Sequence, residues 1–469
     1  MPEEKLESRA APYLFWFLLS LQLLFFAALN LFDDWTLEYM PVKFVGAALI
    51  SGFAYLAAVS RFAVIKARSA QIVVFWSVAL ALRLIAFPLA AGDDLWRYQW
   101  EGKVQHAGFN PYVTAPDDER LLELREDFPE WHKINHRHFR TIYPPGAQML
   151  FAAFTGISDH PIFYKLIFTL ADLATVLVLL RLLRLEGRAF ATRHVSTVGM
   201  PSSQELAPPL YLAAAWYAWN PLVVYSFTGA AHFDSLMLLP MVASILFVAR
   251  SESETNPRRK WLLAVAASCV LGIAISIKLI PVLLILLFAF ALRKRAIVLL
   301  MALMIPLLLS LAYGFPQIKI WQSLSDFAYV TRLNDLFWWL IEDTVWPNPR
   351  QKNYRYNVIV LVCVALISFA FIRNWKRGTV WVFGASLILT PALHAWYCTW
   401  ILPVATWRRT YAWHVLSVTI FAYYLFWNER LFALPWRSEP WLRGIIILPP
   451  LMMLLGSWMR RGSSQRSGE

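Results

Sequence analysis

Charged residues are scarce in this sequence of 469 amino acids. Asp, Glu, Lys and Arg together make up 16% of the positions, whereas soluble domains average about 25%. Hydrophobic residues account for 59%, and they gather in runs of about 20 residues, the length that spans a bilayer. The shortage of charge excludes an ordinary soluble domain, and the apolar runs predict an all-α polytopic membrane protein.

Cysteine is also rare, with three positions in the chain. Cys269, Cys363 and Cys398 each lie alone in or beside an apolar segment. They show neither the spacing of metal ligands nor a disulfide framework. No Asp-x-Asp signature of a divalent-metal site stands out either. We therefore expect no cofactor, and the sequence does not indicate a divalent metal, although the chemistry leaves room for one.

The few charges are mostly positive, with a formal net charge of +13. A basic chain can bind nucleic acid, but here Lys and Arg occupy short loops between apolar runs, and such loops stay cytoplasmic. We assign the charge to membrane topology and expect no nucleic acid partner. The N-terminal segment MPEEKLESRAAPY lacks the basic start of a signal peptide, so we expect it to be retained in the cytoplasm. The basic loops are 61–68, 181–194, 258–260, 293–295, 373–377, 408–409 and 460–461.

These loops give each predicted span a direction. Segments 13–32, 43–60 and 71–91 are the first three spans, and the third ends on the extracytoplasmic side. A long extracytoplasmic loop follows over 92–160. Its apolar part, 147–157, is too short to cross a bilayer at about 1.5 Å per residue. We interpret it as a juxtamembrane or re-entrant helix.

The later apolar runs bring the total to about 14 spans, with both termini in the cytoplasm. We expect one transmembrane domain over 1–469, with two extra spans in 1–70 and a second extracytoplasmic loop at 315–352, which could select the acceptor. The later spans are 162–184, 209–228, 233–250, 261–277, 279–292, 296–314, 353–373, 379–393, 396–407, 411–427 and 441–459.

Conspicuous polar groups fall at joints on the same side as the long loop. Pro281 and Pro403 lie in or beside two short spans, 279–292 and 396–407, and short broken helices usually line a cavity. Each polar group alone has a simpler explanation: a histidine or aspartate can cap a helix, and a lysine can extend to the interface. Their shared placement favours a site. The polar groups are His232, Asp234, Lys278 and His394.

The stretch GDDLWRYQWEG predicts a short helix with its charges on one side. Asp93, Arg97 and Glu101 are spaced by four residues, as are Asp94 and Tyr98. Arg97 can hold one acid ionised and leave the other free. A carboxylate at an apolar boundary beside a cation suits a general base, whereas the alternative is an acidic cap with an ion pair. Both readings stay open at this stage.

Two charges fall inside predicted spans. Arg83 lies in the third and Asp172 in the fourth. An isolated charge in a bilayer is costly, so we predict that the two side chains pair across the helices.

The ordered blocks resemble a known family. DDLWRYQWEGKVQHAGFNPY, IYPPGAQMLFAA, WNPLVVYSFTGAAHFDSLML, IKLIPVLLI and HAWYCTWILP are similar to membrane glycosyltransferases of the GT-C fold. More narrowly, they resemble bacterial polyprenol-phosphate-mannose-dependent mannosyltransferases. The resemblance implies an enzyme of the bacterial inner membrane with an extracytoplasmic active site. It would move a hexose, mannose favoured, from a polyprenyl-phosphate donor to a lipid or glycan acceptor, with inversion.

The resemblance also implies roles for the residues. Asp94 or Asp93 would be the general base, with Asp94 slightly favoured. Arg97, Lys278 and His394 would bind the donor phosphate. The sugar or acceptor contacts would be Tyr98, Glu101, Tyr143, His232, Asp234, Trp396 and Tyr397, although the aromatic residues among them could instead belong to an interfacial belt.

The sequence departs from many relatives in two ways. His394 is followed by Ala395 rather than Pro, and two extra N-terminal spans precede the span that leads into the catalytic loop. Two other functions remain as alternatives. A transporter or flippase of lipid-linked sugars would carry polar groups along a path through the bilayer, often with repeat symmetry. An enzyme like the O-antigen ligases would have its large loop late in the chain.

Overall fold

The computed structural model describes residues 2–37, 39–195, 210–349, 352–427 and 440–466. In these ranges the regular structure is helical, and an isolated β-bridge joins Leu333 to Ala392. The all-α prediction is confirmed. Helices suit this composition because backbone N–H and C=O groups in a bilayer must be satisfied within their own segment.

Several helices have the length and composition to cross a membrane. Within the described ranges seven qualify, and an eighth span forms if α16 (Tyr354–Ala370) and α17 (Trp375–Leu389), bent by 70°, are counted together. Shorter apolar helices cover 280–292, 295–311 and 412–427. The predicted total of about 14 spans is not confirmed and stays a prediction. The seven are α1 (Pro2–Ala28), α2 (Met40–Arg61), α3 (Arg68–Ala86), α7 (Pro161–Val195), α10 (Asp234–Ser253), α11 (Pro257–Ile277) and α21 (Pro440–Arg466).

One predicted span is interrupted. The segment 209–228 was expected to be continuous, but α8 (Leu210–Ala218) ends just before Asn220. The Asn220 side chain accepts hydrogen bonds from two N–H groups of α9 (Pro221–Val224) and caps this helix. A π-helical turn, η5 (Tyr225–Gly229), follows. The prediction of unbroken helix was wrong because the Asn-Pro pair starts a new helix, and proline has no N–H to continue the old one.

The second half of the chain is built from shorter pieces. The predicted loop 315–352 contains two helices, α14 (Gln322–Val330) and α15 (Leu336–Thr344). The predicted spans 279–292 and 296–314 each begin with a 3₁₀ turn. The remaining helices are α12 (Leu284–Leu292), α13 (Leu300–Leu311), α18 (Leu402–Arg408) and α19 (Ala412–Thr419).

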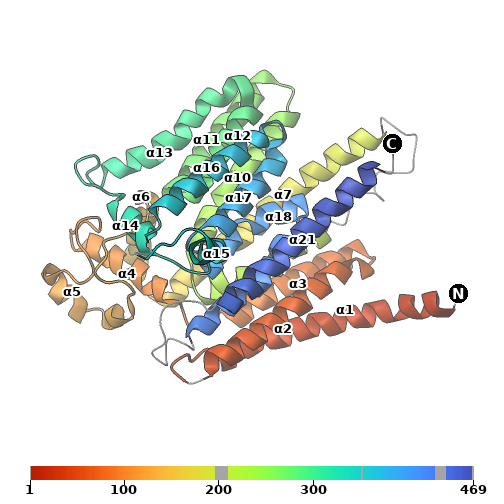
Figure 1. Cartoon of the computed structure of the whole chain (residues 1–469), viewed down its shortest axis with the longest axis horizontal. Helices are drawn as coiled ribbons and strands as arrows, with labels where there is room; N and C mark the ends of the chain where they lie inside the picture. The colour runs from red at the N-terminus through yellow and green to blue at the C-terminus, as the bar shows by residue number, and fades with distance from the viewer. Residues whose placement is uncertain (1, 38, 196–209, 350–351, 428–439, 467–469) are drawn as a thin grey trace.

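The long helices run side by side, with connecting segments at the two ends of the bundle (Figure 1). α4 (Asp93–His106), α5 (Leu122–Glu126) and α6 (Pro145–Ile157) lie at one end, together with α14 and α15. The N-terminus lies at the opposite end. α6 is the short helix expected at 147–157, and at about 1.5 Å per residue its 13 residues are too few to span a bilayer.

The loop after α3 has a small hydrophobic core of its own. Trp100 and Val104 of α4 pack with Leu121, Phe128 and Ile134. This packing folds the segment between α4 and α6 back onto α4. It therefore gives residues 131–144 a fixed position beside the N-terminus of α4.

The predicted intramembrane ion pair is confirmed. Arg83 and Asp172 are both buried, with Nη2 2.5 Å from Oδ2. Arg83 Nη1 also donates to the carbonyls of Ala79 and Ala218, and the Tyr217 hydroxyl donates to the second carboxylate oxygen at 2.9 Å. The pair joins α3, α7 and α8 and leaves neither carboxylate oxygen without a partner.

Candidate active site

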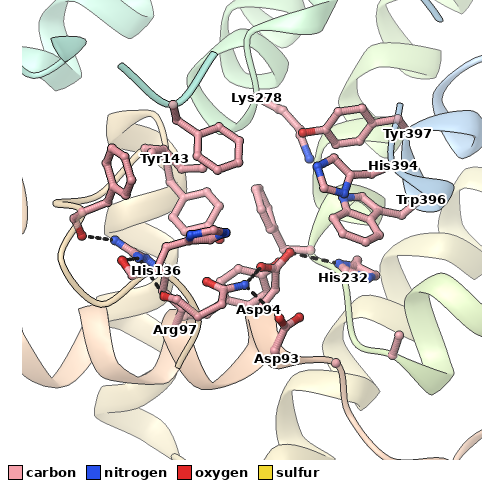
Figure 2. Close-up of a pocket in the computed structure, with 18 of the residues that line it drawn as sticks. Asp93, Asp94, Arg97, His136, Tyr143, His232, Lys278, His394, Trp396 and Tyr397 are labelled. Carbon is pink, nitrogen blue, oxygen red and sulfur yellow. Dashed lines mark hydrogen bonds and ion pairs between the residues drawn. The ribbon is translucent and has the colours of Figure 1, made fainter. Parts of the chain in front are cut away.

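A cavity of about 1950 Å³ opens beside the N-terminus of α4. Five segments that are far apart in the sequence supply its polar wall: 92–98, 131–144, 230–233, 278–283 and 390–400. The side chains that the sequence predicted to converge do meet here (Figure 2). Those on the wall are Asp93, Asp94, Arg97, Tyr98, Tyr143, His232, Lys278, His394, Trp396 and Tyr397. Two others, Glu101 and Asp234, are buried behind the wall and are not part of its surface.

Asp93 and Asp94 form the first turn of α4, where the helix dipole favours negative charge. Gly92 precedes them in extended conformation, and its N–H donates to the Ala230 carbonyl at 2.9 Å. A Cβ at Gly92 would lie 3.3 Å from that carbonyl oxygen. The close approach brings the start of α4 against the segment that carries His232.

The two carboxylates share one amide donor. Asn135 Nδ2 lies 3.1 Å from Asp93 Oδ2 and 3.0 Å from Asp94 Oδ1. Asp94 has further partners: His232 Nδ1 lies 3.5 Å from Oδ2, and the Tyr98 hydroxyl is at the same distance. Asp94 is therefore the carboxylate directed toward the histidines, as Figure 2 shows.

These environments give the carboxyl groups of Asp93 and Asp94 different pKa values. Burial and the negative charge of Asp94 raise the pKa of Asp93 to about 6. Burial acts in the same direction on Asp94, but the close contact and charge of His232, together with the Asn135 amide, hold the Asp94 pKa well below its usual range. Adjacent carboxylates with separated pKa values are typical of acid–base chemistry.

Three aromatic rings, His232, Trp396 and His394, stack on one another beside Asp94. The imidazole of His232 lies face to face with the indole of Trp396, at 3.9 Å between centroids and 19° between planes. His394 stacks on the same indole at 4.6 Å. Burial lowers the pKa of His394 to about 4, so this imidazole is neutral at pH 7. Its Nδ1 is buried without a hydrogen-bond partner among the described residues.

Lys278 lies in an aromatic pocket with a carboxylate at its base. Its ammonium nitrogen is 2.5 Å from Asp234 Oδ1, which also accepts from the Trp400 indole at 2.5 Å. The nitrogen lies 5.0 Å from the Phe233 ring, 5.2 Å from Tyr397 and 4.9 Å from Trp400. The Lys278 side chain is 18% exposed, while Asp234 is fully buried. Lys278 therefore presents a fixed positive charge to the cavity, and Asp234 orients it.

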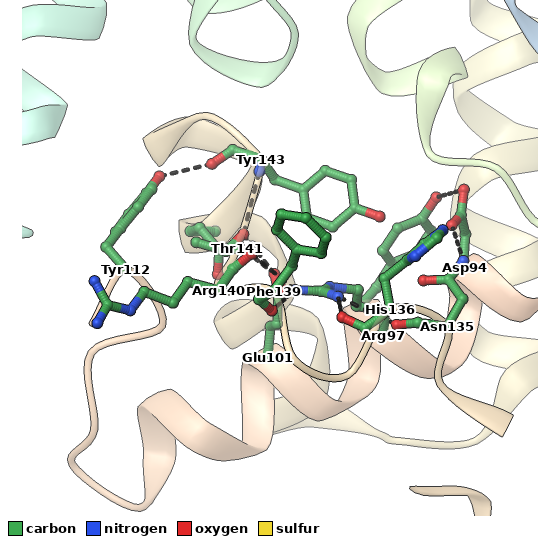
Figure 3. A network of polar contacts seen from close by, with 12 residues as sticks. Asp94, Arg97, Glu101, Tyr112, Asn135, His136, Phe139, Arg140, Thr141 and Tyr143 are labelled. Atoms are coloured by element: carbon green, nitrogen blue, oxygen red, sulfur yellow. Dashed lines mark hydrogen bonds and ion pairs between the residues drawn. The ribbon is translucent and has the colours of Figure 1, made fainter. Parts of the chain in front are cut away.

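Arg97 has a different environment from Lys278 (Figure 3). Its Nε donates to Glu101 Oε1 at 2.8 Å, and the other four N–H groups point at carbonyls of the loop segment 135–140. A guanidinium has five N–H donors, so every one is engaged within the protein. The carbonyls belong to Asn135, His136, Phe139 and Arg140.

Glu101 completes this network from below. Its second oxygen accepts from the Thr141 hydroxyl at 2.9 Å and from the Gln148 amide. Arg97 and Glu101 are both about 2% exposed. Together they fix the loop that places Asn135 across the two aspartates.

A family comparison is consistent with this geometry. A family model described as alpha-(1->6)-mannopyranosyltransferase, N-terminal domain, matches residues 34–294. The chain belongs to this family, the MptA_B family. No curated protein matches the sequence.

Membership in the MptA_B family confirms the predicted resemblance. Together with the apolar helices it identifies a membrane mannosyltransferase of the GT-C type. The matched segment includes both aspartates of α4, His232 and Lys278, and it ends before His394. Four of the five wall segments therefore lie inside the matched region, and 390–400 lies outside it.

Sequence reasoning missed several cavity residues. Asn135 and His136 lie on the wall, and His136 adopts a positive φ of 45°. The run NHRH at 135–138 is unusually polar and could have marked a site, but its spacing does not predict that it lies beside Asp94. The segment Asp33–Thr36 was also missed, because it was interpreted only as a connection between two spans. Among the described residues no group of three or more His, Cys, Asp or Glu side chains could hold a metal ion.

Proposed function

We propose that the protein transfers a hexose, with mannose favoured, from a polyprenyl-phosphate donor to a hydroxyl of a lipid- or glycan-linked acceptor. The reaction takes place at the extracytoplasmic face of the bacterial inner membrane and inverts the anomeric centre. The observation that carries the proposal is the convergence of an ionised aspartate, a lysine and two histidines on one cavity in a mannosyltransferase family.

In this proposal Asp94 is the general base. Its low pKa keeps it ionised, and it faces the centre of the cavity beside His232 (Figure 2). Asp94 takes the proton of the acceptor hydroxyl while the hydroxyl oxygen forms a bond to the sugar C1. The bond from C1 to the phosphate oxygen breaks, and polyprenyl phosphate leaves with the electron pair. A single displacement of this kind inverts C1.

The leaving phosphate requires positive charge and hydrogen-bond donors. Lys278 supplies the charge, and the neutral His394 supplies a ring nitrogen that is buried without a protein partner. We assign Arg97 to positioning, because its donors are all engaged by the protein. Trp396 and Tyr397 then lie where the donor sugar would rest, between Lys278 and Asp94.

The apolar side of the cavity suits the lipid of the donor. Beyond Lys278 the wall consists of Val282 and Leu283 from the segment after α11 and Val360, Leu361 and Val364 from α16. Val282 and Leu361 are 40% and 65% exposed. An apolar wall with exposed outer residues supports lateral access for a polyprenyl chain from the bilayer. The basic loops at the other ends of the spans support an extracytoplasmic active site.

The test is a comparison of donors. The purified protein, reconstituted in lipid nanodiscs, is supplied with radiolabelled mannose either on polyprenyl phosphate or on GDP, together with an alkyl α-mannoside as acceptor. We expect product only from the polyprenyl-phosphate donor, and transfer at the normal rate by the surface variant Glu119→Gln. Direct use of the nucleotide donor at a comparable rate would overturn the proposal.

A further inference from the structure

The cavity has a second side that the proposed donor site does not use. The loop between α1 and α2 contributes four consecutive residues to the wall, Asp33, Asp34, Trp35 and Thr36. Tyr225, Tyr424 and Trp427 line the cavity with them. We call these seven residues the N-terminal arm. It belongs to the same cavity as Asp93 and Asp94.

Hydrogen bonds hold this loop beside the segment that leads into α4, the helix that carries Asp93 and Asp94. The Asp33 carboxylate accepts from the N–H of Ala90, and Asn30 donates to the Ile85 carbonyl at 3.0 Å. Ile85 lies in the last turn of α3, and Ala90 lies in the segment that leads from α3 into Asp93. The N-terminal arm is therefore held at a set position relative to the acids of α4.

The residues that the loop contributes are unsuited to a phosphate. They are two carboxylates, an indole and a hydroxyl, and none carries a positive charge. Asp93 adds a third acid at the inner end of the arm. A lipid phosphate would be repelled here, whereas the opposite side of the cavity offers Lys278. The charge of the arm therefore disfavours an anion, and its hydrogen-bonding groups suit a neutral ligand with hydroxyls.

The same residues suit a sugar ring. Trp35 packs against Phe44, Tyr424 and Trp427, with centroids 5.1, 5.4 and 6.1 Å away. Its indole Nε1 is buried and has no hydrogen-bond partner among the described residues. A buried donor without a partner is costly unless a ligand satisfies it. Asp34 is exposed and has carboxylate oxygens for a hydroxyl, one of which accepts from Thr36 at 2.6 Å.

We infer that the N-terminal arm is the acceptor subsite and binds a neutral hexopyranose, either as a soluble glycan end or as a lipid-linked sugar. Trp35 donates its indole N–H to a ring hydroxyl or ring oxygen, and Asp34 accepts from another hydroxyl. The inference rests on the proposed function, since it places the acceptor opposite the lipid-phosphate donor with Asp93 and Asp94 between them. It gives the extra N-terminal helices a role in acceptor selection.

The experiment separates acceptor from donor kinetics. Trp35→Phe removes the N–H and keeps a ring, and we expect the acceptor KM to rise about tenfold, the effect of one lost hydrogen bond of ordinary strength. Trp35→Ala should raise it further. The donor KM and the slow hydrolysis of the donor by water should stay unchanged in both. Trp16→Phe, on the exposed face of α1, is the matched control, and thermal melting checks folding.

Direct binding separates this inference from the proposed function. Saturation-transfer NMR with methyl α-mannoside and octyl α-mannoside needs no turnover, and it compares a soluble with a lipid-linked hexose. Loss of binding in Trp35→Ala supports the subsite even if the wild type transfers no sugar. An unchanged acceptor KM and unchanged binding in Trp35→Ala, in a protein that does transfer, would overturn the subsite and leave the proposed function standing. An equal rise in donor KM would also overturn it.

Discussion

His232 Nδ1 lies 3.5 Å from the Asp94 carboxylate, although the two residues come from the segment before α10 and the first turn of α4. The contact depends on the close approach of Gly92 to Ala230. It keeps Asp94 ionised and directs it into the cavity. An aspartate that stays ionised across the physiological pH range, in the proposed role of general base, leads to the first prediction.

Replacing His232 should change the acidic limb of the pH–rate profile. His232 lowers the pKa of Asp94, so His232→Ala should raise that pKa and move the limb of kcat/KM to higher pH. The measurement is the rate of sugar transfer between pH 4 and 8. His160→Ala, at an exposed position that does not line the cavity, is the control. An acidic limb at the wild-type pH would argue against the contact.

The raised pKa of Asp93 leads us to expect a second effect of pH on the rate of transfer. Asp93 has a pKa raised to about 6 by burial and by Asp94, and it loses its proton as the pH rises through that value. The new negative charge strengthens Asp94 as a base, so transfer should increase in a step near pH 6. Asp93→Asn should retain part of the activity and lose the step. A step of wild-type size in this variant would contradict the assignment.

Lys278 should govern binding of the donor. Lys278→Met removes the charge that the proposed function assigns to the leaving phosphate. We expect the donor KM to rise by about tenfold to a hundredfold, the range for a charge-assisted contact. The variant also leaves the buried carboxylate of Asp234 without its ion-pair partner. The double variant Lys278→Met/Asp234→Asn also removes the unpaired negative charge, so its thermal stability should return. Its donor KM should stay high. A double variant with the wild-type donor KM would exclude Lys278 from the phosphate site.

The pair of Arg83 and Asp172 should matter for folding rather than for transfer. Removing one partner of a buried ion pair typically costs about 3–5 kcal/mol, so Arg83→Met should unfold at a markedly lower temperature in detergent. Arg83→Met/Asp172→Leu should recover most of the loss, because it leaves no unpaired charge. If the double variant unfolds at the same temperature as Arg83→Met, the ion pair between Arg83 and Asp172 does not account for the lost stability.

The sequence placed much of this site through membrane topology. Asp94, His232, Lys278 and His394 were expected on one side because each lies at a joint between spans, and the cavity brings them together. Topology fixes which end of a span a residue occupies. It does not specify which side chains then touch, as the environment of Arg97 shows.

Arg97 was expected to pair with one acid and to bind the donor phosphate. In the structure it pairs with Glu101 and gives its remaining donors to the backbone of 135–140. Those carbonyls come from an irregular loop with no periodicity to read, so neither they nor Asn135 could be placed in advance. The break at Asn220 was missed for a related reason, since hydropathy alone does not register a cap inside an apolar run.

The most direct measurement is single-turnover transfer of labelled mannose from polyprenyl phosphate by Asp94→Asn, compared with the wild type and with Asp93→Asn. The proposed mechanism predicts that Asp94→Asn loses transfer by at least about a hundredfold, as expected for loss of a general base, while its melting temperature and donor binding are preserved. Asp93→Asn keeps measurable transfer. Near-normal transfer by a folded Asp94→Asn protein would contradict the central claim.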